Sequence, residues 1–324
     1  MTDVLILGGT GWLSGRIALR WLDAGAAVTC LARGARPAPG GARLVVADRS
    51  APGAYDAVRD REWDEVVEIS SIPEHVAEAV AAIGPRALHW TYVSSLSVYA
   101  ADDESGADES AALSAPAVPG DEYDYSRAKA AAEASVSSLG DRVAIVRPGL
   151  IVGPGDPTDR FGYWVGRFAL AADRPVLIPD AATRAAQVID VDDLADFIAQ
   201  RGAERWHGVA NAIGDTMPLR EMLALARDEA GHTGPLVEAD DEWIAAHEVA
   251  YWAGPRSLPL WLPADMTGFA TRSNAAYRAA GGRFRDIRET LRRTLVDERL
   301  RGLDRDRTAG LTRAEELLLI DELG

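Results

Sequence analysis

A tyrosine and a lysine four residues apart are the side chains in this sequence best suited to proton transfer. Lys129, in Tyr125-Ser126-Arg127-Ala128-Lys129, is the single lysine among 324 residues, and the other 33 of the 34 cationic side chains are arginine. Residues i and i+4 of a helix share a face, so a helix here places the ammonium beside the phenol. A nearby cation lowers the pKa of a tyrosine from about 10 toward neutrality, as a general acid or base requires. The spacing therefore predicts acid–base chemistry, unless this is a surface lysine that happens to follow a tyrosine.

A glycine-rich turn near the N-terminus predicts a dinucleotide site. It follows a short apolar run at residues 3–7 and precedes a helical pattern at residues 13–23. Glycines allow a tight turn and let a pyrophosphate approach the amides at a helix N-terminus, where the helix dipole favours anions. We expect the cofactor to bind at Gly8, Gly9, Thr10, Gly11, Trp12 and Leu13.

The end of the second predicted strand distinguishes two forms of this cofactor. An NAD site usually carries an acid there for the ribose 2′-hydroxyl, but this chain has Arg33, with Arg36 close behind. Arginine suits a 2′-phosphate, so we expect NADP(H), although an ordinary surface arginine would look the same. Asp48, after the third strand, is placed to accept a hydrogen bond from the adenine amino group, or is a plain loop aspartate.

Short apolar strands alternate with amphipathic helices in the first part of the chain. The expected strands cover residues 3–7, 27–31, 44–46, 65–69, 88–93 and 143–146, and the expected helices cover residues 13–23, 73–83 and 125–138. Such alternation predicts an α/β fold of Rossmann type, a doubly wound parallel sheet with helices on both faces. This sheet must position both the glycine turn and the Tyr125 helix.

The composition changes after Gly153, where glycine, proline and aromatic residues become more frequent and five of the nine tryptophans fall. We expect a smaller, mixed substrate domain with an aromatic-lined cleft, although core packing also explains most tryptophans. The expected division is an NADP-binding domain (1–152 and 186–212), a substrate-binding region (153–185 and 213–300) and a C-terminal helical tail (301–324).

Charge and composition narrow the partners. The net charge of −16 argues against nucleic acid and anionic membrane surfaces. The single cysteine, Cys30, cannot form an internal disulfide and fits a cytoplasmic protein. We see no leader and no long apolar run, and five scattered histidines give no support for a metal site.

Together these motifs resemble the short-chain dehydrogenase/reductase superfamily, in particular its extended, epimerase-like branch. They occur in family order, and the pattern is most similar to an atypical epimerase-like subgroup found in bacteria. The resemblance rests on the glycine turn, Val93-Ser94-Ser95-Leu96-Ser97-Val98-Tyr99, Tyr125-Ser126-Arg127-Ala128-Lys129, Val146-Arg147-Pro148-Gly149-Leu150-Ile151-Val152-Gly153-Pro154 and Gln187-Val188-Ile189-Asp190-Val191-Asp192-Asp193-Leu194-Ala195.

The resemblance implies catalysis by a serine, a tyrosine and a lysine. Ser95 would polarise the substrate carbonyl, Tyr125 would donate and accept the proton, and Lys129 would lower the pKa of Tyr125 while holding the nicotinamide ribose. Further cofactor contacts are expected at Ser70, Pro148, Gly149, Leu150 and Ile151. Substrate contacts are expected at Arg160, Tyr163, Trp164 and Gln187, unless Thr158 or Asp159 merely caps a helix with Trp164 in the core.

Two positions depart from the family pattern. Ser14 occupies the place of the third glycine in the usual G-x-x-G-x-x-G, with Gly15 one residue later. Nucleotide-sugar dehydratases of the branch carry Asp-Glu directly after the active-site hydroxyl, and this chain has Leu96-Ser97 there. A 4,6-dehydratase is therefore not expected.

Three functions stay open. We favour an NADP(H)-dependent reductase of a C=O or similar group in a small molecule, such as a sugar or specialised metabolite. A sugar or nucleotide-sugar epimerase with tightly bound NAD(P) is the first alternative. A non-catalytic NADP-sensing or RNA-binding protein is the second, and the complete Ser95, Tyr125 and Lys129 set and the net charge argue against it. The oligomeric state is open, with a homodimer as one option.

Overall fold

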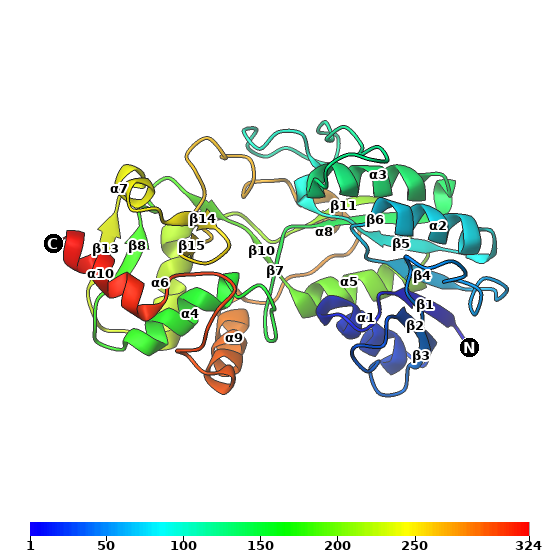
Figure 1. Cartoon of the computed structure of the whole chain (residues 1–324), viewed down its shortest axis with the longest axis horizontal. Coiled ribbons are helices and arrows are strands. Elements are labelled where there is room, and N and C mark those ends of the chain that lie inside the picture. The colour runs from blue at the N-terminus through cyan, green and yellow to red at the C-terminus, as the bar shows by residue number, and fades with distance from the viewer. Residues whose placement is uncertain (324) are drawn as a thin grey trace.

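Seven parallel strands form the central sheet of the N-terminal domain in the computed structural model, which describes residues 1–323 (Figure 1). They lie in the order β11-β6-β5-β4-β1-β2-β3, so the chain reverses direction across the sheet at β1. The expected Rossmann-type α/β fold is confirmed. The bounds are β1 (Asp3–Leu7), β2 (Ala27–Ala32), β3 (Arg43–Val46), β4 (Glu65–Glu68), β5 (Trp90–Val93), β6 (Val143–Pro148) and β11 (Gly208–Ala212).

Helices cover both faces of this sheet because its strands are apolar on both sides. On β1, Val4 and Ile6 belong to one core with residues of α1 (Trp12–Asp23) and α5 (Val191–Ala203). Leu5 and Leu7 point the other way, as alternate strand residues do, into a core with α2 (Pro73–Ile83) and α3 (Tyr125–Ser137). Figure 1 shows these two helical layers on opposite sides of the sheet.

The second domain has its own core of aromatic and aliphatic side chains. Its frame is a parallel pair, β8 (Val176–Pro179) and β13 (Leu236–Ala239), with α4 (Arg160–Ala171), α6 (Leu219–Ala230), α7 (Asp241–Ala246) and α9 (Ile287–Arg301), and beside them the short pair β14 (Ala250–Trp252) and β15 (Ser257–Pro259). The paired strands β7 (Leu150–Val152) and β10 (Val188–Asp190) cross the waist between the domains (Figure 1).

Two segments lie differently from the expected division of the chain. Helix α8 (Ala275–Ala279), placed by sequence in the substrate region, packs on the N-terminal domain because Tyr277 is fully buried there, with its ring centroid 4.3 Å from that of Phe197. Helix α10 (Arg313–Leu323), expected as a tail, buries Leu319 in the second core. Its buried Glu316 accepts a hydrogen bond from the Leu177 amide. The C-terminal segment therefore completes the second domain.

The many arginines serve partly to join the two domains. Asp192, at the start of α5, accepts hydrogen bonds from Arg16 and Arg20 of α1, both at 3.0 Å, and from Arg293 of α9. The planar guanidinium suits such shared carboxylate contacts better than an ammonium does. The network fixes α9 of the second domain against the N-terminal domain. No helix among residues 1–323 is long and apolar enough to cross a membrane.

Candidate functional site

Two adjoining cavities lie at the carboxyl ends of the parallel strands. The first, of about 480 Å³, extends from the glycine turn past the ends of β2 and β3, and the second, of about 460 Å³, lies over the ends of β5 and β6. Trp12, Leu13 and Ile69 line both. Open α/β sheets bind their ligands at this edge, where the strand order reverses. The pair of cavities can hold an elongated ligand such as a dinucleotide.

The glycine turn leads from β1 into α1 along the first cavity. Gly8 has φ +86°, which favours glycine, and its amide donates to the Leu31 carbonyl at 2.8 Å. A Cβ at Gly9 would lie 2.6 Å from the Cys30 Sγ atom, so the turn packs tightly on β2. Of the residues expected at this turn, Gly8, Thr10, Gly11, Trp12 and Leu13 line the cavity, and Gly9 does not.

Ser14 is a structural substitute for the missing third glycine. Its hydroxyl donates to the Gly8 carbonyl at 2.7 Å and accepts from the Gly11 amide at 2.9 Å. The serine thus closes the turn from inside while its own side chain is buried. The residues present form the narrow backbone cradle that a pyrophosphate requires, so they fit a dinucleotide.

At the far end of the first cavity, arginine side chains take the place of the usual acid. Arg33 and Arg36 line this end, both exposed, and Arg33 makes no hydrogen bond or ion pair with any side chain among residues 1–323. Asp48 and Ser70 also line it. The Asp48 carboxylate accepts from the Ser50 amide at 3.0 Å, and the Ser70 hydroxyl accepts from the Ile72 amide at 3.1 Å.

A buried ion pair beside this cavity was not foreseen from the sequence. Arg49 donates through both terminal nitrogens to Glu68, and its Nε atom donates to the Tyr55 hydroxyl at 2.9 Å. Glu68 also accepts from the amides of Ile69, at 2.9 Å, and Ser70, at 2.8 Å. The pair therefore fixes the backbone that separates the two cavities. An arginine and a glutamate nineteen residues apart carry no local signal of such a contact.

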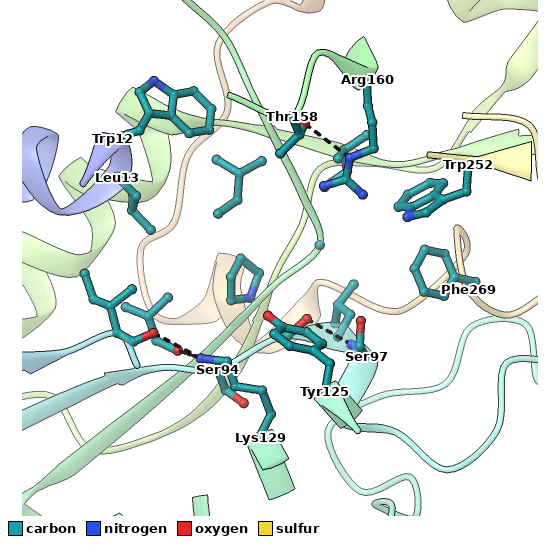
Figure 2. A pocket seen from close by; sticks show the side chains of 18 residues that line it. Trp12, Leu13, Ser94, Ser97, Tyr125, Lys129, Thr158, Arg160, Trp252 and Phe269 are labelled. Carbon is teal, nitrogen blue, oxygen red and sulfur yellow. Dashed lines mark hydrogen bonds between the residues drawn. The ribbon is translucent and has the colours of Figure 1, made fainter. Parts of the chain in front are cut away.

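The second cavity brings together Ser95 and Tyr125. Ser95 follows β5, and its hydroxyl accepts from the Ser97 amide at 3.1 Å. Tyr125 is the first residue of α3, which begins there because Asp124 caps it by accepting from the Arg127 amide at 2.8 Å. Figure 2 shows the Tyr125 ring at the cavity wall, next to Ser97 in the turn that follows Ser95.

Lys129 lies one helical turn beyond Tyr125 and is 3 % exposed. Its ammonium donates to three backbone carbonyls, those of Val93 at 2.7 Å, Ser70 at 3.2 Å and Ile69 at 3.3 Å. Burial lowers the pKa of Lys129 to about 8, against the opposing effect of Glu68 and Glu133. The lysine holds the ends of β4 and β5 together and lines the second cavity.

The pKa of Tyr125 differs from the sequence expectation. The residue is 44 % exposed as a whole, but packing of the phenol against the cavity wall raises its pKa above the ordinary value. The Ser95 hydroxyl and the Arg160 guanidinium oppose this effect and lower the pKa. The Lys129 ammonium itself donates to backbone carbonyls.

The segment after β6 forms the floor of the second cavity. Pro148, Gly149, Leu150 and Ile151, which the resemblance predicts as cofactor contacts, all line it. A Cβ at Gly149 would lie 2.1 Å from the Ile213 Cδ1 atom, so a larger residue here would require the buried Ile213 side chain to shift.

Of the four expected substrate residues, the structure places Arg160 alone at the cavity. Trp164 is 1 % exposed and donates from Nε1 to the Pro259 carbonyl at 2.7 Å, so the core interpretation is the correct one. Tyr163 is fully buried beside it. Gln187 is also buried, and its amide group bonds the backbone of Gly214 and Arg272. Burial thus keeps Tyr163 and Trp164 out of this cavity, whereas Gln187 lines a small pocket that shares Trp252 and Phe269 with it.

The helix that carries Arg160 starts at a residue with unusual geometry. Asp159 is the N-cap residue of α4, with φ +58°, but its side chain does not cap the helix. It accepts instead from Arg301 at 2.9 Å and from the Thr308 amide at 3.0 Å. The alternative to a substrate site was a helix cap by the side chain of Thr158 or Asp159. Within residues 1–323, no such side-chain cap is formed at the start of α4.

Several cavity residues were not identified as site residues from the sequence, and three of them lie around Arg160. Trp252 and Phe269 form an aromatic wall, with ring centroids 5.0 Å apart and planes at 84°, and Thr158 lies beside Arg160. Figure 2 shows Arg160, Trp252 and Phe269 across the cavity from Tyr125. The high aromatic content after Gly153 was the one signal, and it does not distinguish this pair from the core tryptophans. Among residues 1–323, no three His, Cys, Asp or Glu side chains are grouped as a metal site would need.

Comparisons with known proteins agree with this geometry. The model of the NAD dependent epimerase/dehydratase family matches residues 4–207, which is more than half of the chain. A comparison with curated proteins gave no match. Many solved structures share the fold.

Three of these structures illustrate the likeness. A proposed epimerase from Burkholderia cenocepacia J2315 has a TM-score of 0.72 and 20% identity, over 92% of this chain and 98% of that one. The UDP-glucose 4-epimerase of Thermotoga maritima, solved with UDP-glucose, has a TM-score of 0.68 and 13% identity, over 93% and 99%. The enzyme WbmG of Bordetella bronchiseptica, solved with NAD and UDP, has a TM-score of 0.66 and 16% identity, over 93% and 96%. The expected kinship is confirmed: this chain belongs to the NAD dependent epimerase/dehydratase family.

Proposed function

We propose that this protein is an NADP(H)-dependent oxidoreductase that reduces the carbonyl group of a small metabolite. The observation that carries the proposal is the second cavity, in which Ser95 and Tyr125 share a wall directly beside the cavity of the glycine turn. A tyrosine hydroxyl at that place can protonate an oxygen as hydride reaches the adjacent carbon.

Three residues of the cavity have a defined part in the proposed reaction. A bound nicotinamide supplies the hydride. Ser95 orients and polarises the carbonyl by donating a hydrogen bond to its oxygen, and Tyr125 donates its phenolic proton to that oxygen, so the product is an alcohol. Solvent returns a proton to Tyr125. Lys129, held by three carbonyls, fixes the strand ends and would lie near the ribose of a bound cofactor.

The choice of NADP(H) rests on Arg33, which is exposed at the end of the first cavity and free of ion pairs within the described residues. We expect NADPH to bind more tightly than NADH, and Arg33→Asp to reduce or reverse that preference. A charge-assisted contact contributes about 1.5–3 kcal/mol, or roughly 10- to 100-fold in affinity. Fluorescence titration with both cofactors measures it, with the exposed Arg43→Asp as a matched control. Equal affinities in the wild-type protein would contradict this choice.

An epimerase is the second candidate, because the family and several solved relatives are described by that activity. The two differ in the fate of the cofactor. A reductase exchanges it in every cycle, whereas an epimerase restores it within the cycle and gains by holding it.

Absorbance of added NADPH during conversion of a substrate separates the two. We expect dialysed protein to have lost its cofactor and to consume one NADPH per product molecule, since a reduction ends with oxidised cofactor. Product formed without net loss of NADPH, by protein that already carries oxidised cofactor, would establish the epimerase. We further propose a cytoplasmic protein that acts on small molecules and not on nucleic acid, in accord with its net charge of −16.

A further inference from the structure

The second cavity is positively charged in a strongly acidic protein. Of the residues that line it, the charged ones are Lys129 and Arg160, and no aspartate or glutamate is among them. The chain as a whole has a net charge of −16. A cavity lined by one sign of charge with apolar walls focuses the field and attracts the opposite charge. The lining therefore favours an anionic ligand.

Arg160 has free donors facing this cavity. Its Nε atom donates to the Thr158 hydroxyl at 3.2 Å, which leaves both terminal nitrogens without a hydrogen-bond partner among residues 1–323. The guanidinium lies over the Trp252 ring, 4.9 Å from its centroid, and Figure 2 shows it directed toward Tyr125. Stacking on an aromatic face and two parallel donors are the features with which arginine holds a planar carboxylate.

The acids closest to Arg160 in sequence are occupied elsewhere. Asp156 directs both carboxylate oxygens to Thr158, whose amide and hydroxyl donate to it at 2.8 and 3.0 Å. Asp159 accepts from Arg301, Arg305 and Thr308. Other arginines of the second domain, such as Arg167 and Arg307, are paired with buried glutamates. Burial lowers the pKa of Arg160 and the charge of Asp156, which is linked to it through Thr158, opposes this effect. No carboxylate among residues 1–323 forms a direct ion pair with Arg160, so its terminal nitrogens stay available to a ligand.

We propose that Arg160 binds a carboxylate of the substrate, so that the substrate is a carbonyl compound with a carboxylate near the carbonyl and an apolar or ring portion against Trp252 and Phe269. This inference rests on the proposed function, because the carbonyl must lie at Ser95 and Tyr125. Arg160 and Tyr125 line the same cavity, and Figure 2 shows the guanidinium directed toward the phenol, so a group bound to Arg160 faces the side chain that donates the proton. The aromatic wall completes the pocket at the side away from the glycine turn.

Benzoylformate and its methyl ester are suitable probes because they share the ketone and ring and differ in the charge. We expect wild-type protein with NADPH to reduce benzoylformate with a kcat/KM about 10- to 100-fold above that of the ester. Arg160→Gln should remove this preference by slowing the acid alone. Arg160→Lys should restore part of it, since an ammonium keeps the charge but not the two parallel donors. Arg299→Gln, at an exposed arginine of α9 outside the cavity, is the matched control and should leave the preference unchanged.

Binding of benzoylformate to protein saturated with NADP⁺, measured by calorimetry, separates this inference from the proposed function. One outcome is that benzoylformate binds to the NADP⁺ complex in a way that depends on Arg160, but that protein with NADPH does not reduce it. This outcome would support the anion pocket and contradict the reductase. Reduction of acid and ester at equal rates would support the reductase and overturn the role of Arg160. Absence of both binding and reduction of benzoylformate would overturn the inference, as would a preference for the acid that survives in Arg160→Gln.

Discussion

Tyr125→Phe should lower kcat for carbonyl reduction by about 10²–10⁴-fold, since proton transfer by a positioned side chain contributes this much. The substitution removes one hydroxyl at the cavity wall and no buried contact of α3. We therefore expect the midpoint of thermal unfolding and the affinity for the cofactor to stay at their wild-type values. Steady-state kinetics on any substrate that is found, with a cofactor titration beside it, give both results.

Tyr123→Phe is the matched control for this experiment. Tyr123 is 61 % exposed, and its hydroxyl donates to the Ser71 hydroxyl at 3.2 Å, outside the lining of the second cavity. It should keep wild-type turnover. If Tyr125→Phe also keeps it, Tyr125 is not the proton donor and the reaction proposed for Ser95 and Tyr125 is wrong.

Glu133→Leu should lower the free energy of unfolding by about 3–5 kcal/mol, as breaking one side of a buried ion pair does. Glu133 of α3 accepts from Arg147 of β6 at 2.9 and 2.7 Å, and both side chains are 4 % exposed. Loss of the carboxylate leaves the guanidinium buried without a counter-charge. Because this pair anchors the helix of Tyr125 to the sheet, catalysis should also suffer at temperatures where the protein remains folded. Denaturant unfolding followed by tryptophan fluorescence measures the loss.

An exposed pair provides the comparison for this value. Glu62 and Arg86 are bonded at 2.9 Å but are 72 % and 46 % exposed, so Glu62→Ala should cost less than about 1 kcal/mol. The double variant Glu133→Leu with Arg147→Leu should be more stable than Glu133→Leu alone, because no unpaired charge remains. An unfolding midpoint for Glu133→Leu equal to that of Glu62→Ala would contradict this account of the pair.

Local spacing in the sequence determined the architecture and the proposed reacting residues. Strand and helix periods and the glycine turn predicted the sheet, and the predicted helix at residues 73–83 agrees with α2 at both ends. The spacing of four positions from Tyr125 to Lys129 places them on consecutive turns of one helix, whatever the rest of the chain does. Such features depend on backbone geometry over a few residues, and the sequence contains that information directly.

Contacts between distant segments decided the chemistry around those residues. The sequence could not tell that Lys129 faces carbonyls of β4 and β5, because the partners lie 36 to 60 residues away. The sequence also predicted Arg160, Tyr163 and Trp164 of one helix as substrate contacts and did not distinguish among them. The packing of α4 against the second core buried the two aromatic residues and left the arginine at the cavity. There it lies beside Trp252 of β14, a strand far from α4 in the sequence. Helical periodicity states which side chains share a face, but tertiary packing alone selects the face that meets the ligand.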